Sequence, residues 1–151
     1  FIARIRQLGF GQRTGIELAG ETTGIVKDRD SKSWSARSKP TIAIGQEISV
    51  SALQMVQAAT AIANGGVPVK LTVINKITNK DGTVFSVHKP EYKERVFSKS
   101  TADYVLSCME TTAKEGTGSR ANIGDVSIGV QTGTAQMADK AKEAGITLCF
   151  E

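Results

Sequence analysis

The chain has 151 residues, enough for one domain or a large part of one. Its content of 40% hydrophobic and 23% charged residues is ordinary for a globular protein, and no apolar run approaches the roughly 20 residues that span a bilayer. The net charge of +4 would allow an anionic partner, but acidic residues are interspersed, aromatic residues are only 5%, and no nucleic-acid-binding motif is present. We therefore expect a solvated basic surface and no nucleic-acid partner, with an anionic surface or polymer as the minor alternative.

The first part of the chain is predicted to be a helix followed by a long loop. Residues 1–8 form an amphipathic segment that ends at Gly9, a common C-terminal signal of helices, and this start is typical of a piece of a longer protein. Residues 9–41 are rich in Gly, Thr, Ser and charge, which predicts a long surface loop with one short hairpin. Loops of this length are usually functional or mobile.

A helix is predicted over residues 52–63. Ser51 and Gln54 have the spacing of a capping box, in which each side chain pairs with the backbone of the other residue. Apolar residues recur at helical spacing and would form one stripe: Ala52, Met55, Val56, Ala59, Ile62 and Ala63. Asn64-Gly65-Gly66 ends the segment. We expect the stripe to pack closely against a sheet or another helix.

The middle of the chain is predicted to hold a hairpin and a second helix. Residues 69–77 and 83–87 would be its strands, joined by the turn Asn79-Lys80-Asp81-Gly82. The helix would run over residues 101–114, capped by Ser98 or Ser100 and ended by Gly116. Its apolar face would be Val105, Leu106, Met109, Thr112 and Ala113.

The last part of the chain is predicted to be a strand, a connector and a further strand. Val126, Ile128 and Val130 alternate with Ser127, Gly129 and Gln131, which predicts a strand with one apolar face. The Gly/Thr-rich residues 132–134 would expose N–H groups and hydroxyls that suit an anion. Residues 137–145 read as a charged connector. Residues 146–150 begin another strand, and an end inside a strand again indicates a fragment.

The two cysteines and the single histidine form no metal-binding pattern. Cys108 and Cys149 match no ligand spacing, and His88 has no cysteine or second histidine near it. Both cysteines lie in apolar stretches, which favours buried thiols, while a disulfide between them stays open. We expect no metal site.

Four blocks of the sequence, taken in order, resemble signatures of class B penicillin-binding proteins. They are residues 9–18 with Gly20, Glu21 and Gly24; residues 43–51 with 53–54 and 61–66; Gly116-Thr117-Gly118 with Ala121; and residues 132–136. The first resembles the stretch after the family's second catalytic motif. The last resembles its third catalytic motif, Lys-Thr-Gly followed by Thr-Ala-Gln. Together the blocks cover about residues 1–136.

The resemblance implies an α/β fold of the α+β type, the penicillin-recognising transpeptidase fold, with a mostly antiparallel sheet flanked by helices. Residues 1–151 would be the later half of that single domain. The nucleophile of the Ser-x-x-Lys motif and the Ser-x-Asn element would lie upstream of residue 1, so no catalytic residue is expected here. Ser86-Val87-His88-Lys89 spells the first motif, but on a strand Ser86 and Lys89 point to opposite faces. We treat that match as a coincidence.

The resemblance also implies that Gln131, Thr132, Gly133 and Thr134 bind substrate or a β-lactam. The hydroxyls of Thr132 and Thr134 would meet the substrate carboxylate, and Gly133 would let the backbone approach it. The N–H of Thr134 would donate to the oxyanion, a contact worth ~2.7–4 kcal/mol in transition states. The alternative is an ordinary edge strand with turn-forming residues.

Gln131 departs from the family pattern, because the family has a lysine there. Strand alternation places Gln131 opposite Val130, on the face away from the core. A glutamine can donate a hydrogen bond to a carboxylate but carries no charge, so acylation should be about ten- to a few hundred-fold slower. Three explanations stay open: a natural variant with altered activity, a degenerate paralogue that only binds, and an engineered or erroneous residue.

The function that the resemblance implies is D,D-transpeptidation in peptidoglycan cross-linking, by a serine acyl-enzyme in the parent protein. This fragment alone would not turn over substrate. Its ligands would be a stem peptide ending in D-Ala-D-Ala or a β-lactam, with cell-division or elongation proteins as partners of the parent and no metal or organic cofactor. The parent would act in the periplasm, on the outer face of the bacterial cytoplasmic membrane, through an anchor absent from this chain. The alternative is a non-catalytic peptidoglycan-binding or scaffold paralogue on the same fold.

Overall fold

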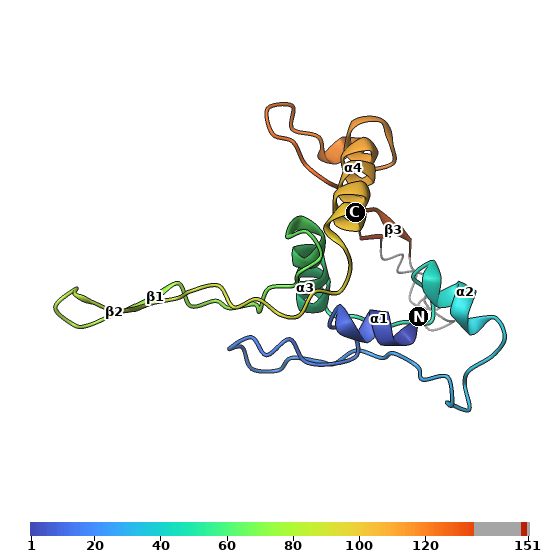
Figure 1. The fold of residues 1–151 in the computed structure, drawn as a ribbon, viewed down its shortest axis with the longest axis horizontal. Coiled ribbons are helices and arrows are strands. Elements are labelled where there is room, and N and C mark those ends of the chain that lie inside the picture. The colour runs from blue at the N-terminus through green and yellow to red at the C-terminus, as the bar shows by residue number, and fades with distance from the viewer. Residues whose placement is uncertain (135–148, 151) are drawn as a thin grey trace. The chain divides into compact units, whose positions relative to one another are not determined.

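The computed structural model describes residues 1–134 and 149–150 (Figure 1). The chain forms two compact units. Unit 1 comprises Phe1–Val26 and Ser49–Ala102, and unit 2 comprises Lys27–Ile48 and Asp103–Glu151. Both strand pairs in the described residues are antiparallel, and helices accompany them, as the predicted α/β fold of the α+β type requires. No helix of this described part combines the length and the apolarity needed to cross a membrane.

Unit 1 begins with helix α1, Ile2–Gln7, which ends where the sequence predicts. Gly9 follows with φ +102, and a Cβ at this position would lie 2.0 Å from the amide nitrogen of Gln57. The Gln57 amide in turn donates to the carbonyl of Leu8, at 3.4 Å, and its oxygen accepts from Lys93, at 2.9 Å. The end of α1 is therefore held against helix α3, Ala52–Ala63, through one buried glutamine.

Helix α3 begins with the predicted capping box. The Ser51 hydroxyl accepts from the N–H of Gln54, at 3.2 Å, and the Gln54 side chain accepts from the N–H of Ser51, at 2.9 Å. These bonds satisfy donors that an uncapped helix start leaves without partners. Asn64 is the C-terminal cap, so both ends of α3 agree with the sequence prediction.

The predicted apolar stripe of α3 is wrong in this structure. Its buried residues are Gln54, Gln57 and Ala61, whereas Met55 and Val56 are 51% and 52% exposed. The reason is that the chain segment after α1 lies against this side of the helix and offers backbone carbonyls, which need donors when buried. The Gln54 and Gln57 amides supply those donors. Hydrophobic periodicity carries no information about where such carbonyls lie.

The hairpin of unit 1 consists of β1, Lys76–Thr78, and β2, Val84–Val87. Its predicted turn is confirmed: the N–H of Gly82 donates to the carbonyl of Asn79, at 3.0 Å, and the N–H of Asn79 to Thr83, at 2.8 Å. The first strand is shorter than residues 69–77. Val69 forms only an isolated bridge, and the N–H of Val73 donates to the Glu17 carboxylate, so it is not used in a strand ladder.

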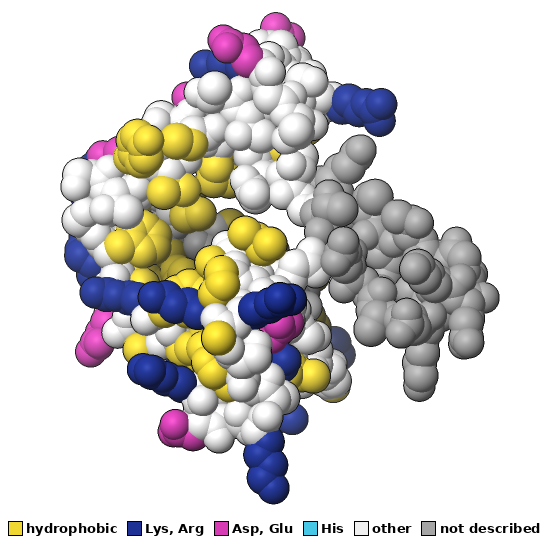
Figure 2. Space-filling view, turned by 90° about the vertical axis from the view of Figure 1, so that its right-hand side faces the viewer, with side chains coloured by type: hydrophobic (Ala, Val, Ile, Leu, Met, Phe, Trp, Pro, Cys, Tyr) yellow, Lys and Arg dark blue, Asp and Glu magenta, His cyan; other side chains and the backbone are white. Residues whose placement is uncertain are grey.

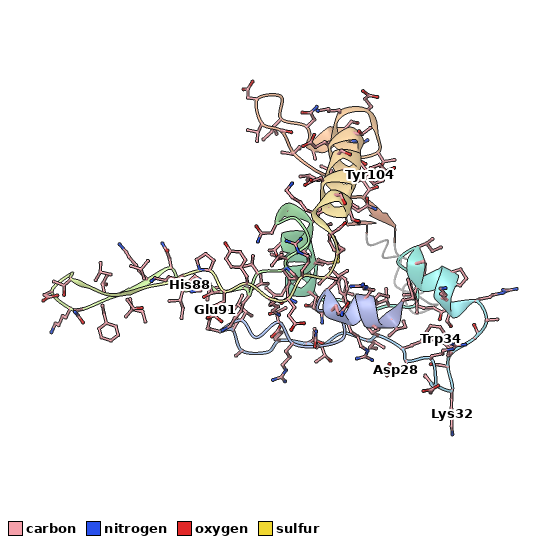
Figure 3. All side chains as sticks on the ribbon, in the orientation of Figure 1. Asp28, Lys32, Trp34, His88, Glu91 and Tyr104 are labelled. Atoms are coloured by element: carbon pink, nitrogen blue, oxygen red, sulfur yellow. The ribbon has the colours of Figure 1, made fainter. Side chains whose placement is uncertain are left out.

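The Ser-x-x-Lys match lies on this hairpin, as predicted. Ser86 pairs with Ile77 inside β2, and His88 follows the strand, with its N–H donating to the carbonyl of Asn75 at 2.8 Å (Figure 3). A strand does not bring the first and fourth residues of the match to one face.

Unit 2 contains a helix that the sequence prediction missed. Helix α2, Ser38–Ala43, begins inside residues 9–41, which were predicted to be a loop, and ends two residues beyond them. The Ser38 side chain is buried and donates to the Glu47 carboxylate, at 3.0 Å. The Lys27 ammonium is also 3.0 Å from Glu47, and hydrogen bonds from Lys27 and then Ser38 lower the pKa of that carboxyl. The polar residues that suggested a loop are thus used to hold a short helix.

Helix α4, Lys99–Glu115, confirms the second predicted helix and extends it by a residue or two at each end. The Ser98 hydroxyl accepts from the N–H of Thr101, at 3.2 Å, which makes Ser98 the cap. On the predicted apolar face Ala113 is buried and Val105, Leu106, Met109 and Thr112 are half-buried. Tyr104, labelled in Figure 3, is 71% exposed.

Cys108 is exposed on α4, so the predicted burial of this thiol is wrong. The helical turn places it away from the buried side of Ala113, and an apolar stretch of sequence does not reveal which side a residue takes. Cys149 lies in β4, Cys149–Phe150, and the predicted burial of its thiol stays a prediction. The predicted connector, residues 137–145, and the first residues of the predicted last strand lie outside the described part of the chain.

The predicted strand over residues 126–131 is also wrong. These residues form no ladder, and the N–H of Val130 donates instead to the carbonyl of Met109 in α4, at 3.0 Å. Ile128 and Val130 are half-buried while Val126 is 55% exposed. Alternation therefore gives the inward-facing residues near the motif correctly, but it does not specify a strand partner.

Candidate functional site

The residues predicted to bind a ligand lie at the start of a short strand. Strand β3, Gly133–Thr134, pairs antiparallel with β4, with Gly133 opposite Phe150 and Thr134 opposite Cys149. Gln131 and Thr132 directly precede β3. The four predicted residues are therefore consecutive on a segment whose last part is a paired strand. Thr134 takes part in that pairing through its backbone.

Gln131 and its neighbours alternate in burial. Val130 and Thr132 are half-buried, whereas Gln131 and Gly133 are exposed. The side-chain amide of Gln131 donates to the backbone carbonyl of Thr132, at 3.1 Å. Gln131 thus lies on the solvent side, as alternation predicts, and its side-chain amide is an uncharged donor.

Thr117 is a contact of this segment that the sequence reasoning missed. Its hydroxyl oxygen lies 2.9 Å from that of Thr132, and either atom can be the donor. Thr117 belongs to the turn Gly116-Thr117-Gly118 after α4, where the N–H groups of both glycines donate to the carbonyl of Thr112, at 3.1 and 3.2 Å. The sequence did contain a signal for the importance of Thr117, because this turn and the Thr-Gly-Thr segment are two of the four family-like blocks.

The side chain of Val130 packs against this turn and explains one of its glycines. Gly118 is buried, and a Cβ there would be 2.5 Å from the Cγ1 atom of Val130. Real Cβ atoms do not come this close to another carbon, so any larger residue would push the turn away from Val130. Because Gly118 has no side chain, the turn can lie against Val130. Thr117 is then within hydrogen-bond reach of Thr132.

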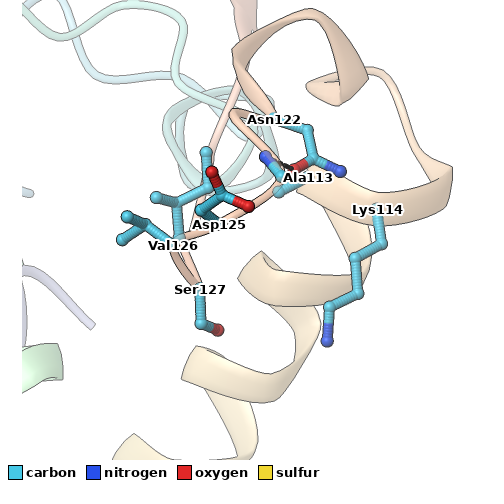
Figure 4. A pocket seen from close by; sticks show the side chains of 8 residues that line it. Ala113, Lys114, Asn122, Asp125, Val126 and Ser127 are labelled. Atoms are coloured by element: carbon cyan, nitrogen blue, oxygen red, sulfur yellow. Dashed lines mark hydrogen bonds between the residues drawn. The ribbon is translucent and has the colours of Figure 1, made fainter.

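A pocket of about 260 Å³ lies between the end of α4 and the following loop (Figure 4). Its polar lining includes Lys114, Asn122, Asp125 and Ser127. The Asn122 side chain accepts from the N–H of Gly124, at 3.0 Å, which shapes one wall. None of the residues that line this pocket is a predicted ligand-binding residue, so the pocket and the candidate site are separate features of unit 2.

Charges of both signs lie on the face of the described residues that Figure 2 shows. On the face shown in Figure 2, Lys and Arg side chains are scattered and Asp and Glu lie among them. Within residues 1–134 and 149–150, no three His, Cys, Asp or Glu side chains come together in a way that could hold a metal ion. The expectation that the function needs no metal stays a prediction.

Two titratable groups of unit 1 lie in the loop and helix contacts described above. Hydrogen bonds from the hydroxyl and then the N–H of Thr14 lower the pKa of Glu21, and the N–H bond is 2.6 Å long. Partial burial lowers the pKa of Lys93, the residue that donates to Gln57. Glu21 thus bonds within the loop after α1, and Lys93 bonds to Gln57 of α3.

Known proteins are similar to this chain over nearly its whole length. The family model of the penicillin binding protein transpeptidase domain matches residues 3–147. Penicillin-binding protein PbpB of Mycolicibacterium smegmatis is 34% identical over 148 residues, which cover 93% of this chain and 22% of that protein. Stage V sporulation protein D of Bacillus subtilis is 34% identical over 142 residues, covering 91% of this chain and 21% of that protein. The chain thus spans about a fifth of the length of these curated relatives.

A solved structure agrees in fold as well as in sequence. The crystal structure of penicillin binding protein 3 from Mycobacterium tuberculosis matches with a TM-score of 0.78 and 32% identity, over 99% of this chain and 33% of that one. The same protein has been solved in complexes with aztreonam and with ampicillin. The family-model match, the relatives and the shared fold lead to one conclusion: this chain belongs to the penicillin-binding protein transpeptidase family, and its similarity is to the class B members.

Proposed function

We propose that this chain is part of the transpeptidase domain of a D,D-transpeptidase that cross-links peptidoglycan, and that it supplies the carboxylate-binding edge of the site. The observation that carries the proposal is the placement of residues 131–134. Gln131 and Gly133 are exposed, the Thr132 hydroxyl is hydrogen-bonded to Thr117, and β3 is paired on one side. An anionic ligand could reach hydroxyl and N–H donors at this edge.

In this proposal each residue of the segment has a role. A serine outside this chain attacks the carbonyl of the penultimate D-Ala of a stem peptide, the C–N bond to the terminal D-Ala breaks, and that D-Ala leaves with a proton while the acyl-enzyme forms. With a β-lactam the ring C–N bond breaks instead, and the protonated ring nitrogen stays attached to the acyl group. The hydroxyls of Thr132 and Thr134 hold the terminal carboxylate. The N–H of Thr134 donates to the oxyanion, and Gly133 leaves room for the ligand backbone. The role of Gln131 is to donate a neutral hydrogen bond where the family uses a charge.

The nucleophile is proposed to lie N-terminal to Phe1, in the same domain. Support comes from the small share of its relatives that the chain spans, 22% and 21%, and from Ser86, whose place in β2 is unsuited to a helical Ser-x-x-Lys motif. The parent protein would act outside the cytoplasmic membrane on stem peptides ending in D-Ala-D-Ala. It would bind β-lactams, need no cofactor, and work with division or elongation proteins.

Gln131 favours a second candidate function, a peptidoglycan-binding or scaffold protein without turnover. An exposed amide cannot replace the Coulomb attraction of an ammonium group for a carboxylate. A ligand whose carboxylate is bound without that attraction should acylate the serine more slowly. Binding through the Thr132 hydroxyl and the β3 backbone would remain. The two candidates therefore differ in covalent labelling and agree in ligand binding.

The test is covalent labelling of the full-length protein that contains this chain with a fluorescent penicillin. We expect slow labelling of the natural protein and an increase of about ten- to a few hundred-fold for Gln131→Lys, because the ammonium restores the charged contact. Gln7→Lys adds the same charge at an exposed residue of unit 1 and should change nothing.

Three other results would change the conclusion. Equal labelling of the natural protein and Gln131→Lys would show that Gln131 does not limit acylation. Binding of D-Ala-D-Ala peptides without labelling of either protein would establish the scaffold function. Neither labelling nor peptide binding would rule out both candidates.

A further inference from the structure

We propose that Thr117 is a positioning residue that directs the hydroxyl proton of Thr132 toward an anionic ligand. The two hydroxyl oxygens are 2.9 Å apart, a normal hydrogen-bond length. A threonine hydroxyl has one proton to donate and two lone pairs to accept. If Thr117 donates, Thr132 accepts with a lone pair and keeps its own proton for the ligand. The inference rests on the proposed function, in which Thr132 binds the substrate carboxylate.

An anionic ligand selects this direction of the hydrogen bond. A carboxylate only accepts, so the bound state requires Thr132 to donate to the ligand and Thr117 to donate to Thr132. Each bond in such a chain polarises the next, which strengthens the contact with the charge. Without Thr117, the Thr132 hydroxyl would turn freely among its staggered positions, and binding would have to select one of them.

The turn that carries Thr117 is fixed to α4 on both sides of the residue. The N–H groups of Gly116 and Gly118 both donate to the carbonyl of Thr112, at 3.1 and 3.2 Å. Thr117 is exposed between these two anchored glycines, with its side chain against Thr132. Its position is set by the last turn of a 17-residue helix.

The segment that carries Thr132 is fixed to the same helix. The N–H of Val130 donates to the carbonyl of Met109, at 3.0 Å, and a Cβ on Gly129 would lie 3.1 Å from the Cβ of Met109. Val130 also fills the space beside Gly118. Both partners of the hydroxyl pair are therefore held by α4, and such support from outside the site keeps a binding group in its productive orientation.

The test compares three variants of the full-length protein. Thr117→Val keeps the shape and removes the hydroxyl, whereas Thr117→Ser keeps the hydroxyl. Thr111→Val is the matched control, because the Thr111 hydroxyl bonds within α4, to the carbonyl of Ser107 at 3.0 Å. We expect the second-order rate of acylation by a fluorescent penicillin to fall about two- to tenfold for Thr117→Val. Thr117→Ser should stay within about twofold of the natural protein, and Thr111→Val should be unchanged.

A second substitution tests whether Thr117 acts through Thr132. In a protein that already carries Thr132→Val, the further change Thr117→Val should have no effect on the acylation rate, because the hydroxyl that it orients is gone. If the two losses multiply, Thr117 acts independently of Thr132 and the inference is wrong. It is also wrong if Thr117→Val and Thr117→Ser are acylated at the same rate.

Hydrogen exchange separates this inference from the proposed function. The backbone amides of residues 129–132 should exchange faster in Thr117→Val than in Thr117→Ser. This measurement does not require the protein to react with penicillin. If exchange differs while neither the natural protein nor Gln131→Lys is labelled, the positioning role of Thr117 stands and the transpeptidase function does not. If exchange is the same in both Thr117 variants, the positioning role fails whatever the labelling shows.

Discussion

Gln54 allows the sharpest test of what holds unit 1 together, through the substitution Gln54→Met. The Gln54 side chain is fully buried and takes part in three hydrogen bonds. Its oxygen accepts from the N–H of Ser51, at 2.9 Å, and its nitrogen donates to the carbonyls of Gln12, at 2.7 Å, and Thr23, at 2.8 Å. Methionine has a similar volume and shape but offers none of these bonds, so the substitution removes them with little change in packing.

The expected loss follows from the number of bonds. A hydrogen bond contributes about 1 kcal/mol net, and groups left buried without a partner cost at least as much. Three bonds therefore correspond to about 3 kcal/mol, which raises the equilibrium constant for local opening roughly 150-fold. The amides of α3 should report this change, because they become exposed when the contacts of Gln54 break.

The assay is native-state hydrogen exchange of the full-length protein, followed for the amides of α3. Gln7→Met is the matched control, because Gln7 is exposed on α1 and its oxygen accepts from Arg4 at the surface. Surface substitutions of this kind change stability by at most ~0.5 kcal/mol. If Gln54→Met opens α3 no more often than Gln7→Met does, the buried amide is not what joins α3 to the loop.

Two further predictions concern unit 1. Gly66 has φ +94, and a Cβ there would lie 2.0 Å from the Phe97 carbonyl oxygen. Gly82 has a similar φ of +86, but the space around it is open. Gly66→Ala should therefore lower the thermal midpoint of unfolding far more than Gly82→Ala. Left-handed backbone alone costs alanine about 1–2 kcal/mol, and equal midpoints for the two variants would refute the clash. Hydrogen bonds from Thr14 hold the pKa of Glu21 below its ordinary value, so Glu21 should stabilise the fold above the unfolded pKa and lose this contribution as the pH falls through its folded pKa. The difference in midpoint between the natural protein and Glu21→Gln should therefore be full at neutral pH and shrink as the pH falls through the folded pKa of Glu21, and a difference independent of pH would contradict this.

The features predicted correctly from the sequence are those that depend on neighbours along the chain. The capping box of Ser51 and Gln54 sets the start of α3, and the turn around Gly82 sets the hairpin, because each uses contacts between residues a few positions apart. Helix α4 follows from its periodic face and from the Ser98 cap. The sequence therefore predicts the end of a helix or hairpin correctly when residues a few positions away form the cap or the turn.

The features predicted wrongly depend on distant partners. The side of α3 that is buried is decided by carbonyls at Gln12 and Thr23, which no pattern inside residues 52–63 reveals. Alternation around Val130 gives the direction of side chains but not a strand partner, and the partner of its N–H is a helix carbonyl. For the candidate site, family-like blocks identified both the turn and the Thr-Gly-Thr segment. Only the fold shows that the hydroxyls of Thr117 and Thr132 meet.

The bonds of Gln54 also have a consequence for the order of events during synthesis. They join residues 42 and 31 positions apart in the chain, so the loop of residues 9–26 leaves the ribosome before the helix that satisfies its carbonyls exists. At ordinary elongation rates of 5–20 residues per second, the interval until α3 is complete is roughly 2–7 seconds. During that time the carbonyls of Gln12 and Thr23 lack the Gln54 donors and can be hydrogen-bonded by water instead. Residues 9–26 should therefore gain protection from a protease only after α3 has been made, although they precede it in the chain.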